Sequence, residues 1–278
     1  MEIRWATHCD IPAAKKLMQD VFHDNDLFLN IFFDCFFDHN LLLGIKNDQV
    51  VSMAFLLPAQ MIIHQKNTNI SYLYACATAE SERGNGWMRA IIDHAWDTSC
   101  RNGEAGLFLL PAEKSLYDYY AKLDFHDFFY YDEDIYDFNN NISESSPCFQ
   151  LAPLNAEQYN HHRRQLLKTE YAIHYPTRHF QFAEKENTNP DAGFYQLSLH
   201  GESAIFYGII ENNHLNIGEL LGSIDSNAIA PFLSHHFQVT QITLIKPGHS
   251  HKSAMLRPAK GYEFLIGGKG YFNWGGNE

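Results

Sequence analysis

The chain has 278 residues with a formal net charge of −13, and 45% of them are hydrophobic against 19% that are charged. This length suits one large domain or two ordinary ones, and the apolar share is ample for a packed core. The acidic balance disfavours binding to nucleic acid or to anionic membranes. It is compatible with a cationic small molecule such as an amine, although ordinary solubility explains it more simply.

The first half of the sequence alternates between helix and strand patterns. Asp10 and Pro12 are start signals for a helix over residues 10–22, and the apolar run 27–38 predicts a second helix or a wide apolar patch. Asn47-Asp48-Gln49 separates two strand-like runs in the manner of a hairpin turn. The expected strands cover residues 41–46, 50–58, 70–78, 107–110 and 128–138, and further helices are expected over 86–101 and 113–123.

The second half repeats this order after a polar break. Residues 139–147, NNNISESSP, are rich in Asn and Ser and end in Pro147, which predicts a linker between domains 1–140 and 148–278. Helices are then expected over 156–172 and 227–237, and strands over 194–200, 203–211, 215–222 and 241–246. Because both halves read helix, hairpin, strand, helix, strand, the sequence predicts a duplicated α/β architecture.

A short glycine loop, Arg83-Gly84-Asn85-Gly86, joins the expected strand 70–78 to the expected helix 86–101. The first N–H groups of a helix lack internal partners and carry the positive end of its dipole, and glycines let the backbone curl around a phosphate. The loop therefore predicts a pyrophosphate site, although a solvent-exposed turn explains the string alone equally well. GxGxxG and GK[ST] patterns are absent, so neither a dinucleotide fingerprint nor a Walker loop is indicated.

The stretch from Tyr74 to Phe125 resembles the GNAT N-acetyltransferase family. In that family a strand leads into an [RQ]xxGx[GA] loop that grips CoA, and a later helix carries a pattern like LYxKxGF. Here the first motif is RGNGWM and the second is YYAKLDF, separated by one helix and one strand. The resemblance implies a GNAT fold, with a mixed central sheet flanked by helices.

Two residues depart from the family pattern, and the wider layout points to one branch. Met88 replaces a small residue, which implies a narrower pyrophosphate cradle, and Asp124 replaces the usual Gly before Phe125, which implies a different turn. The two-domain order resembles the enhanced-intracellular-survival-like branch, in which a second GNAT-like domain lacks the CoA motif. The segment SIDSNAIA of the second half has neither the Arg nor the Gly pair.

The resemblance also implies roles for individual residues in a direct acyl transfer. Backbone donors of the fourth strand would polarise the thioester carbonyl, and a Tyr on the later helix would protonate the leaving thiolate. Tyr120 matches that position, with Tyr117 as its rival, and Glu278 is a candidate base because the C-terminal carboxylate enters the active site in that branch. The implied cofactor-binding residues are Cys76, Ala77, Thr78, Arg83, Gly84, Asn85, Gly86, Trp87 and Met88.

Other chemistry-bearing residues have simpler interpretations. Six carboxylates near the implied site are candidate bases, but each is better explained as solvated surface charge; they are Asp24, Asp26, Asp34, Glu80, Glu82 and Glu113. The 16 His residues show no zinc-ligand spacing, so no metal is expected. Cys76 is better explained as packing than as a nucleophile, because no His accompanies it locally.

The sequence thus predicts an N-acetyltransferase that moves an acetyl group from acetyl-CoA to an amine of a small, cationic acceptor. The alternative is a degenerate GNAT pair that binds CoA or a partner without turnover, and a protein-terminal acetylase is a weaker third reading. No signal peptide or membrane-spanning run is evident, and five scattered Cys without CxxC favour a reduced cytoplasmic home. A homo-oligomer is a further expectation, since GNAT proteins often dimerise.

Overall fold

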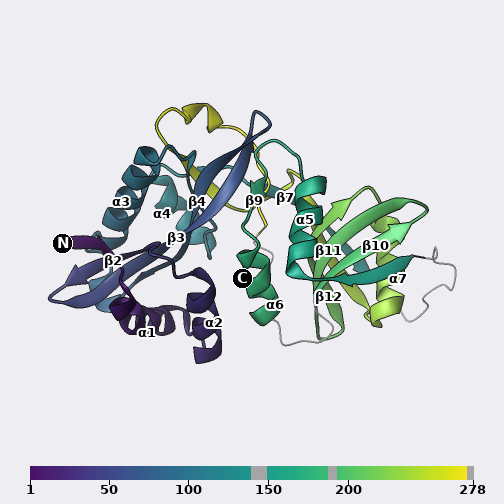
Figure 1. Ribbon diagram of the computed structural model, residues 1–278, viewed down its shortest axis with the longest axis horizontal. Helices are drawn as coiled ribbons and strands as arrows, with labels where there is room; N and C mark the ends of the chain where they lie inside the picture. Colours follow the sequence, from purple (N-terminus) through teal and green to yellow (C-terminus); the bar gives the residue numbers. More distant parts are fainter. Residues whose placement is uncertain (139–148, 187–192, 274–278) are drawn as a thin grey trace. The chain divides into compact units, whose positions relative to one another are not determined.

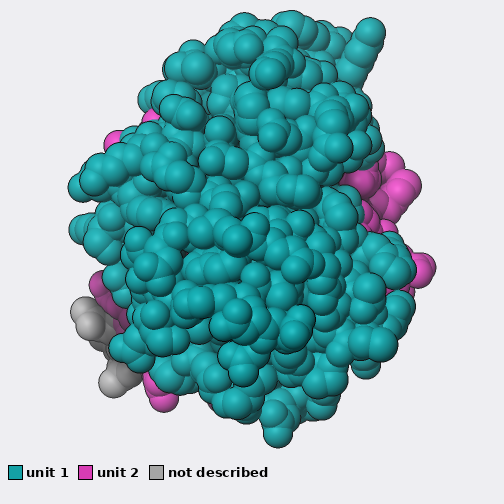
Figure 2. Space-filling model, turned by 90° about the vertical axis from the view of Figure 1, so that its left-hand side faces the viewer, with its two compact units in different colours: residues 1–129, 253–269 teal, residues 130–252, 270–278 magenta. Residues whose placement is uncertain are grey.

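The chain divides into two compact units, each made of two separate stretches of sequence. The computed structural model describes residues 1–138, 149–186 and 193–273. Unit 1 contains Met1–Phe129 and Ser253–Lys269, and unit 2 contains Tyr130–Lys252 and Gly270–Glu278 (Figure 2). This division differs from the predicted one, because the first boundary falls at Phe129 and a late segment returns to unit 1. The expected linker 139–147 lies outside the described residues.

Unit 1 is built on a mixed sheet whose strands follow the order β1-β2-β3-β4-β5-β15-β6. All neighbours along this path are antiparallel except β4 and β5, which are parallel and joined through helix α3. The strands are β1 (Glu2–Trp5), β2 (Leu41–Lys46), β3 (Gln49–Ile63), β4 (Lys66–Thr78), β5 (Gly106–Leu109), β15 (Met255–Pro258) and β6 (His126–Asp127).

Helices cover both faces of this sheet (Figure 1). On one face, Phe32 of α2 packs its ring against Phe55 of β3 and Tyr74 of β4, with ring centroids 5.1 Å apart in both pairs. On the other face, Ile91 of α3 lies in a buried apolar cluster with Leu73 of β4. The helices are α1 (Ile11–Phe22), α2 (Asp26–Phe36), α3 (Trp87–Arg101) and α4 (Lys114–Ala121).

Unit 2 repeats the same plan on its own sheet, in the order β8-β10-β11-β12-β13-β7-β14. Strands β12 and β13 are its parallel pair, and α7 connects them. The strands are β8 (Gln150–Leu154), β10 (Gly193–Leu199), β11 (Glu202–Glu211), β12 (His214–Gly222), β13 (Gln241–Pro247), β7 (Tyr130–Asp137) and β14 (His251–Lys252). The remaining elements are α5 (Ala156–Leu166), β9 (Ile173–His174), α6 (Arg178–Glu186) and α7 (Ser226–Phe237).

The two sheets exchange one strand each along the chain. Strand β15, from near the C-terminus, lies between β5 and β6 in unit 1. Strand β7, which directly follows the first stretch of unit 1, lies between β13 and β14 in unit 2. A cut at the predicted linker would therefore remove β15 from unit 1 and β7 from unit 2.

The predicted elements agree with the structure in order and differ in extent. Strand β3 runs five residues beyond the predicted end, because Pro58 is exposed and its ring is tolerated within the strand. Helix α5 ends at Leu166 instead of residue 172. Strands β1 and β8 and helix α6 were not expected from the pattern. Among the described residues no helix is long and apolar enough to cross a membrane.

Candidate active site

Strands β4 and β5 separate towards their carboxyl ends. Their pairing consists of Ser71 with Leu107 and Tyr72 with Phe108, whereas β4 continues to Thr78. The later residues of β4 therefore face a gap in the sheet on the side of β5. In a regular sheet these backbone groups would be hydrogen-bonded to the next strand. Here a ligand can reach them.

A β-bulge lies in β4 beside this gap. Met53 of β3 pairs with Ala77 and Phe55 pairs with Tyr74, so Ala75 and Cys76 both fall opposite one residue of β3. Ala75 has a positive φ of 50°. A bulge of this kind re-aims backbone groups and side chains, and the register leaves Cys76 without a partner on β3. Cys76, Ala77 and Thr78, the expected neighbours of a thioester, thus line the gap's β4 edge.

The glycine loop ends at the first turn of α3 with its amides open. Gly84 and Gly86 have φ values of 80° and 81°. A Cβ at either glycine would meet nothing within 4 Å, so backbone conformation and not space calls for glycine here. In this described segment the amides of Gly84, Gly86, Trp87 and Met88 have no acceptor, while Asn85 N lies 3.4 Å from the carbonyl of Glu82. Several exposed N–H groups at a helix start form an anion site.

The side chains that follow the loop anchor it to the core. Trp87 is buried at 5% exposure, and its ring lies so close to Gly44 of β2 that an added Cβ would be 2.8 Å from it. Met88 is half-buried and packs against the apolar cluster on the α3 face of the sheet. The expectation that Met88 narrows the cradle is therefore not what the structure shows, because its side chain takes part in the core. Both residues offer the site their amides.

Arg83 is exposed beside this loop, and its Nε lies 3.4 Å from the carbonyl of Thr78. This contact holds the base of the guanidinium near the end of β4. Arg83 therefore places a permanent positive charge next to the open amides.

Tyr120 of α4 reaches the same region from the other side. It is buried at 7% exposure in the apolar cluster on the α3 face, where Cys76 also packs. Burial is the main cause that raises the pKa of the Tyr120 hydroxyl, and the neighbouring Cys76 thiol adds to it. Burial likewise raises the pKa of Cys76 to about 12, so the thiol stays protonated at neutral pH and is a poor nucleophile. Tyr120 is thus a neutral O–H donor beside the bulge.

Tyr117 has a different environment. It is half-buried, and its hydroxyl donates to the carbonyl of Ser253, which precedes β15. This bond ties α4 to the returning segment of unit 1. The structure therefore brings Tyr120 to the bulge and gives the Tyr117 hydroxyl a structural partner.

The candidate bases separate into three groups. Glu80, Glu113, Asp26 and Asp34 are exposed. Glu82 is tied by hydrogen bonds from Lys46, Asn85 and Trp87, which hold its pKa below the usual value. Asp24 is half-buried between α1 and α2, and burial raises its pKa. Glu278 lies outside the described residues.

Asp124 lies in the turn that follows α4. Its φ is 63°, in the left-handed region, and its amide donates to the carbonyl of Ala121. Asp tolerates this region better than most residues. The turn after α4 thus has a residue at positive φ, and Asp124 supplies it at a cost of roughly 1 kcal/mol.

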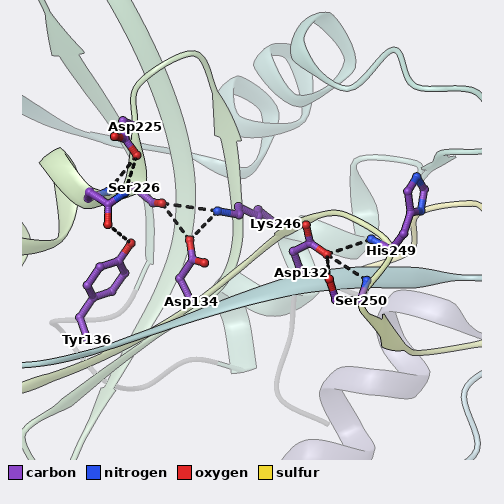
Figure 3. Close-up of polar contacts among 9 residues, drawn as sticks. Asp132, Asp134, Tyr136, Asp225, Ser226, Lys246, His249 and Ser250 are labelled. Atoms are coloured by element: carbon purple, nitrogen blue, oxygen red, sulfur yellow. Dashed lines mark hydrogen bonds and ion pairs between the residues drawn. The ribbon is translucent and has the colours of Figure 1, made fainter.

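The counterpart of the loop in unit 2 carries negative charge of its own (Figure 3). The carboxylate of Asp225 caps α7 by accepting from the amide of Asn227 at 3.1 Å. Ser226, the first residue of α7, donates to Asp134 of β7 at 2.8 Å, and Lys246 of β13 forms an ion pair with the same carboxylate. Two carboxylates therefore sit at the helix start where unit 1 offers open amides.

Comparisons with known proteins agree with this geometry. The family model of the acetyltransferase (GNAT) domain matches residues 2–126. This part of the chain is therefore similar to the GNAT domain. The match covers less than half of the chain and lies within unit 1, and a comparison with functionally curated proteins finds no match.

Solved structures extend the likeness over both units. A probable N-acyltransferase of unknown function from Enterococcus faecalis V583 superposes with a TM-score of 0.74 at 13% identity, covering 93% of this chain and 73% of that one. A GCN5-related N-acetyltransferase from Anabaena variabilis gives 0.71 at 15% identity, covering 92% and 72%. Eis1 from Mycobacterium abscessus gives 0.67 at 10% identity, covering 89% and 66%. At these identities the likeness shows the fold: a GNAT domain followed by a second GNAT-like unit.

The sequence analysis missed the residues that support the glycine loop from outside the motif. Gly44 and Lys46 lie on β2, about forty residues before the loop, and no local pattern marks them. Glu82 was considered only as a base. Within the described residues, no group of three or more His, Cys, Asp or Glu is arranged to hold a metal ion.

Proposed function

We propose that unit 1 is an N-acetyltransferase that transfers an acetyl group directly from acetyl-CoA to an amine of a small, cationic acceptor. The observation that carries this proposal is the set of open amides of Gly84, Gly86, Trp87 and Met88, next to a gap between β4 and β5. A diphosphate at these amides places the pantetheine arm along the gap. The thioester then reaches the bulge at Cys76, with Tyr120 on the far side.

In the proposed reaction, an amide at the bulge polarises the thioester carbonyl and stabilises the oxyanion that forms when the amine attacks. The intermediate collapses with cleavage of the C–S bond, and Tyr120 donates its proton to the leaving thiolate. The amine loses one proton, and its acceptor is left open among the candidate carboxylates. The chain's acidic charge favours a cationic acceptor.

Binding of acetyl-CoA tests the loop assignment. Gly86→Glu places a carboxylate at the diphosphate position and is expected to abolish binding in isothermal titration. Gly86→Ala is the matched control: it meets nothing within 4 Å and carries only the strain of positive φ, so it keeps most of the affinity. Equal affinity of wild type and Gly86→Glu would refute the assignment.

A thiol-release assay across a panel of amines tests turnover. Tyr120→Phe is expected to reduce kcat about 10²-fold or more while leaving CoA affinity unchanged. Tyr117→Phe serves as the comparison, because the Tyr117 hydroxyl donates to Ser253, and kcat should change much less. Tight CoA binding with no thiol release on any amine would instead favour a GNAT pair without turnover.

We further propose that unit 2 contributes no second CoA site, since Asp225 and Asp134 occupy its helix start. Titration should accordingly give one acetyl-CoA per chain. A cytoplasmic location fits Cys9, Cys76 and Cys100, which are free thiols in the described part of the chain. Homo-oligomerisation remains an expectation that sedimentation can check.

A further inference from the structure

The carboxylate of Glu82 joins three parts of unit 1 that surround the glycine loop. Its Oε1 accepts from Lys46 Nζ at the end of β2, at 2.7 Å. Its Oε2 accepts from Asn85 Nδ2 in the loop at 3.3 Å and from Trp87 Nε1 at the start of α3 at 3.2 Å. With 14% of its side chain exposed, Glu82 lies at the back of the loop and uses both oxygens.

The loop needs such support because its own residues do not define one shape. Gly84 and Gly86 are exposed, and a Cβ added at either would meet nothing within 4 Å. As glycines they can also adopt backbone conformations other than the positive φ seen here. The helix cap at Gly86 has no side chain to hold it. Trp87, fixed against Gly44, is the nearest rigid point, and the Glu82 bond connects the preceding turn to it.

We propose that Glu82 is a positioning residue for the diphosphate of acetyl-CoA, holding residues 83–88 in the open form through Trp87 and Asn85 while Lys46 neutralises its charge. The inference rests on the proposed function and adds a requirement to it. A carboxylate close to an anion site would by itself weaken binding by repulsion. Lys46 removes most of that repulsion and leaves the ordering effect of the hydrogen bonds.

The direction in which Kd changes distinguishes repulsion by the Glu82 charge from ordering of the loop. If Glu82 acted only as a nearby negative charge, its removal would tighten CoA binding in any variant. If it orders the loop, Glu82→Ala weakens binding although a negative charge is lost. Glu82→Gln keeps an acceptor oxygen for Trp87 Nε1 and is expected to stay close to wild type.

Isothermal titration with acetyl-CoA on the full chain measures these outcomes. Glu82→Ala is expected to raise Kd about tenfold, Trp87→Phe about fivefold, and Glu82→Gln less than about threefold. Asp97→Ala is the control, because it removes one exposed negative charge from α3 three turns after Trp87 and leaves Kd unchanged. Tighter or unchanged binding in Glu82→Ala overturns the inference.

Steady-state kinetics separate positioning from base catalysis. Glu82→Ala should raise KM for acetyl-CoA and leave kcat within about twofold, with the acidic limb of the pH profile of kcat retained. A fall in kcat at unchanged KM, or loss of that limb, makes Glu82 a base and overturns the inference.

A double-mutant cycle keeps the test open if Glu82→Ala folds poorly. The single change Trp87→Phe removes one N–H and keeps the ring against Gly44, and combined with Glu82→Gln it should cost no more than Trp87→Phe alone. Additive losses would contradict a shared bond. If wild type binds no acetyl-CoA, the proposed function fails together with the inference; if wild type binds and all variants match it, the inference alone fails.

Discussion

The helix that connects the two parallel strands begins in opposite ways in the two units. In unit 1, α3 begins after Gly86, whose left-handed backbone leaves the first amides open and uncapped. In unit 2, α7 begins after Asp225, whose side chain accepts from Asn227, and Asp134 lies against Ser226. The same topology therefore presents a positive end to solvent in one unit and a neutralised end in the other.

The gap between the two parallel strands also differs between the units: it is open in unit 1 and occupied in unit 2. Strand β12 has a register shift at Gly218 where β4 has its bulge, but the Gly218 carbonyl accepts from Asn273 of the C-terminal segment. The next residue, Glu219, pairs through both oxygens with the fully buried Arg163 at 2.7 and 3.0 Å. Unit 2 thus fills with its own hydrogen bonds and a buried ion pair the position that unit 1 leaves open.

Removing the exchanged strand β15 is expected to have the largest effect, because unit 1 then loses a strand of its sheet. Fragment 1–138 lacks β15, so β5 loses its partner strand, Trp96 Nε1 loses the Pro258 carbonyl and Asp93 loses Arg257. The fragment should show no cooperative thermal transition by circular dichroism. A chain joining residues 1–129 to 253–269 by a short Gly-Ser turn should fold, since Ser253 N donates to the Phe129 carbonyl. Cooperative unfolding of fragment 1–138 would contradict the exchange.

Breaking the buried ion pair should strongly destabilise unit 2. Arg163→Met leaves the Glu219 carboxylate buried without its cation, at a cost of about 3–5 kcal/mol in the free energy of unfolding. Urea denaturation measures this loss. The double change Arg163→Met with Glu219→Leu should recover most of it, because both charges are then gone; if the double variant is as unstable as the single one, the pair is not the cause.

Acid should weaken unit 2 through two buried histidines. Burial lowers the pKa of His174 to about 4 and that of His179 to about 3, with nearby Arg charges adding to the effect. As pH falls below about 6.5, the unfolded chain takes up protons that the folded form does not, so stability drops by about 1.4 kcal/mol per pH unit for each His. Hydrogen exchange of peptides from unit 2 between pH 7 and 4.5 measures it.

His179→Phe is the matched control for the acid effect. Phe keeps the ring that stacks on Tyr175 at 4.6 Å and cannot be protonated. The slope of stability against pH should fall by roughly half. An unchanged slope would assign the acid sensitivity to other groups.

Removing the cap of α7 sharpens the comparison of the two helix starts. Asp225→Ala should lower stability by about 1 kcal/mol, because the amide of Asn227 loses its acceptor. It should not create a second acetyl-CoA site, since Asp134 remains against Ser226. Titration giving two molecules per chain would show that Asp225 alone closes the unit 2 site.

The smallest expected effect is a gain in stability. Asp124→Gly relieves the positive φ of 63° and should raise thermal stability by up to about 1 kcal/mol. Asp124→Asn is the control, because Asn tolerates the same conformation and should change little. A loss of stability in Asp124→Gly would mean that the 3.8 Å contact with Arg257 outweighs the strain.

Local patterns in the sequence were sufficient for the elements around the site. The strand ending at Thr78, the glycine loop and the helix from Trp87 are set by short-range signals, and they appear where predicted. The candidate Tyr120 was identified from its place in the second motif. Helix α6 and the true end of α5 were missed, since tertiary packing and not periodicity defines them.

The sequence by itself determined the α/β order of both halves, the loop with its two glycines and the absence of that loop from the second half. Only the tertiary structure decided which distant segments complete each unit. The pairing of β15 with β5, the place of Trp87 against Gly44 and the Lys46–Glu82 pair all join residues far apart in the chain. The physical reason is that hydrogen bonding and helix dipoles act within a few residues, whereas strand exchange and burial depend on the whole fold.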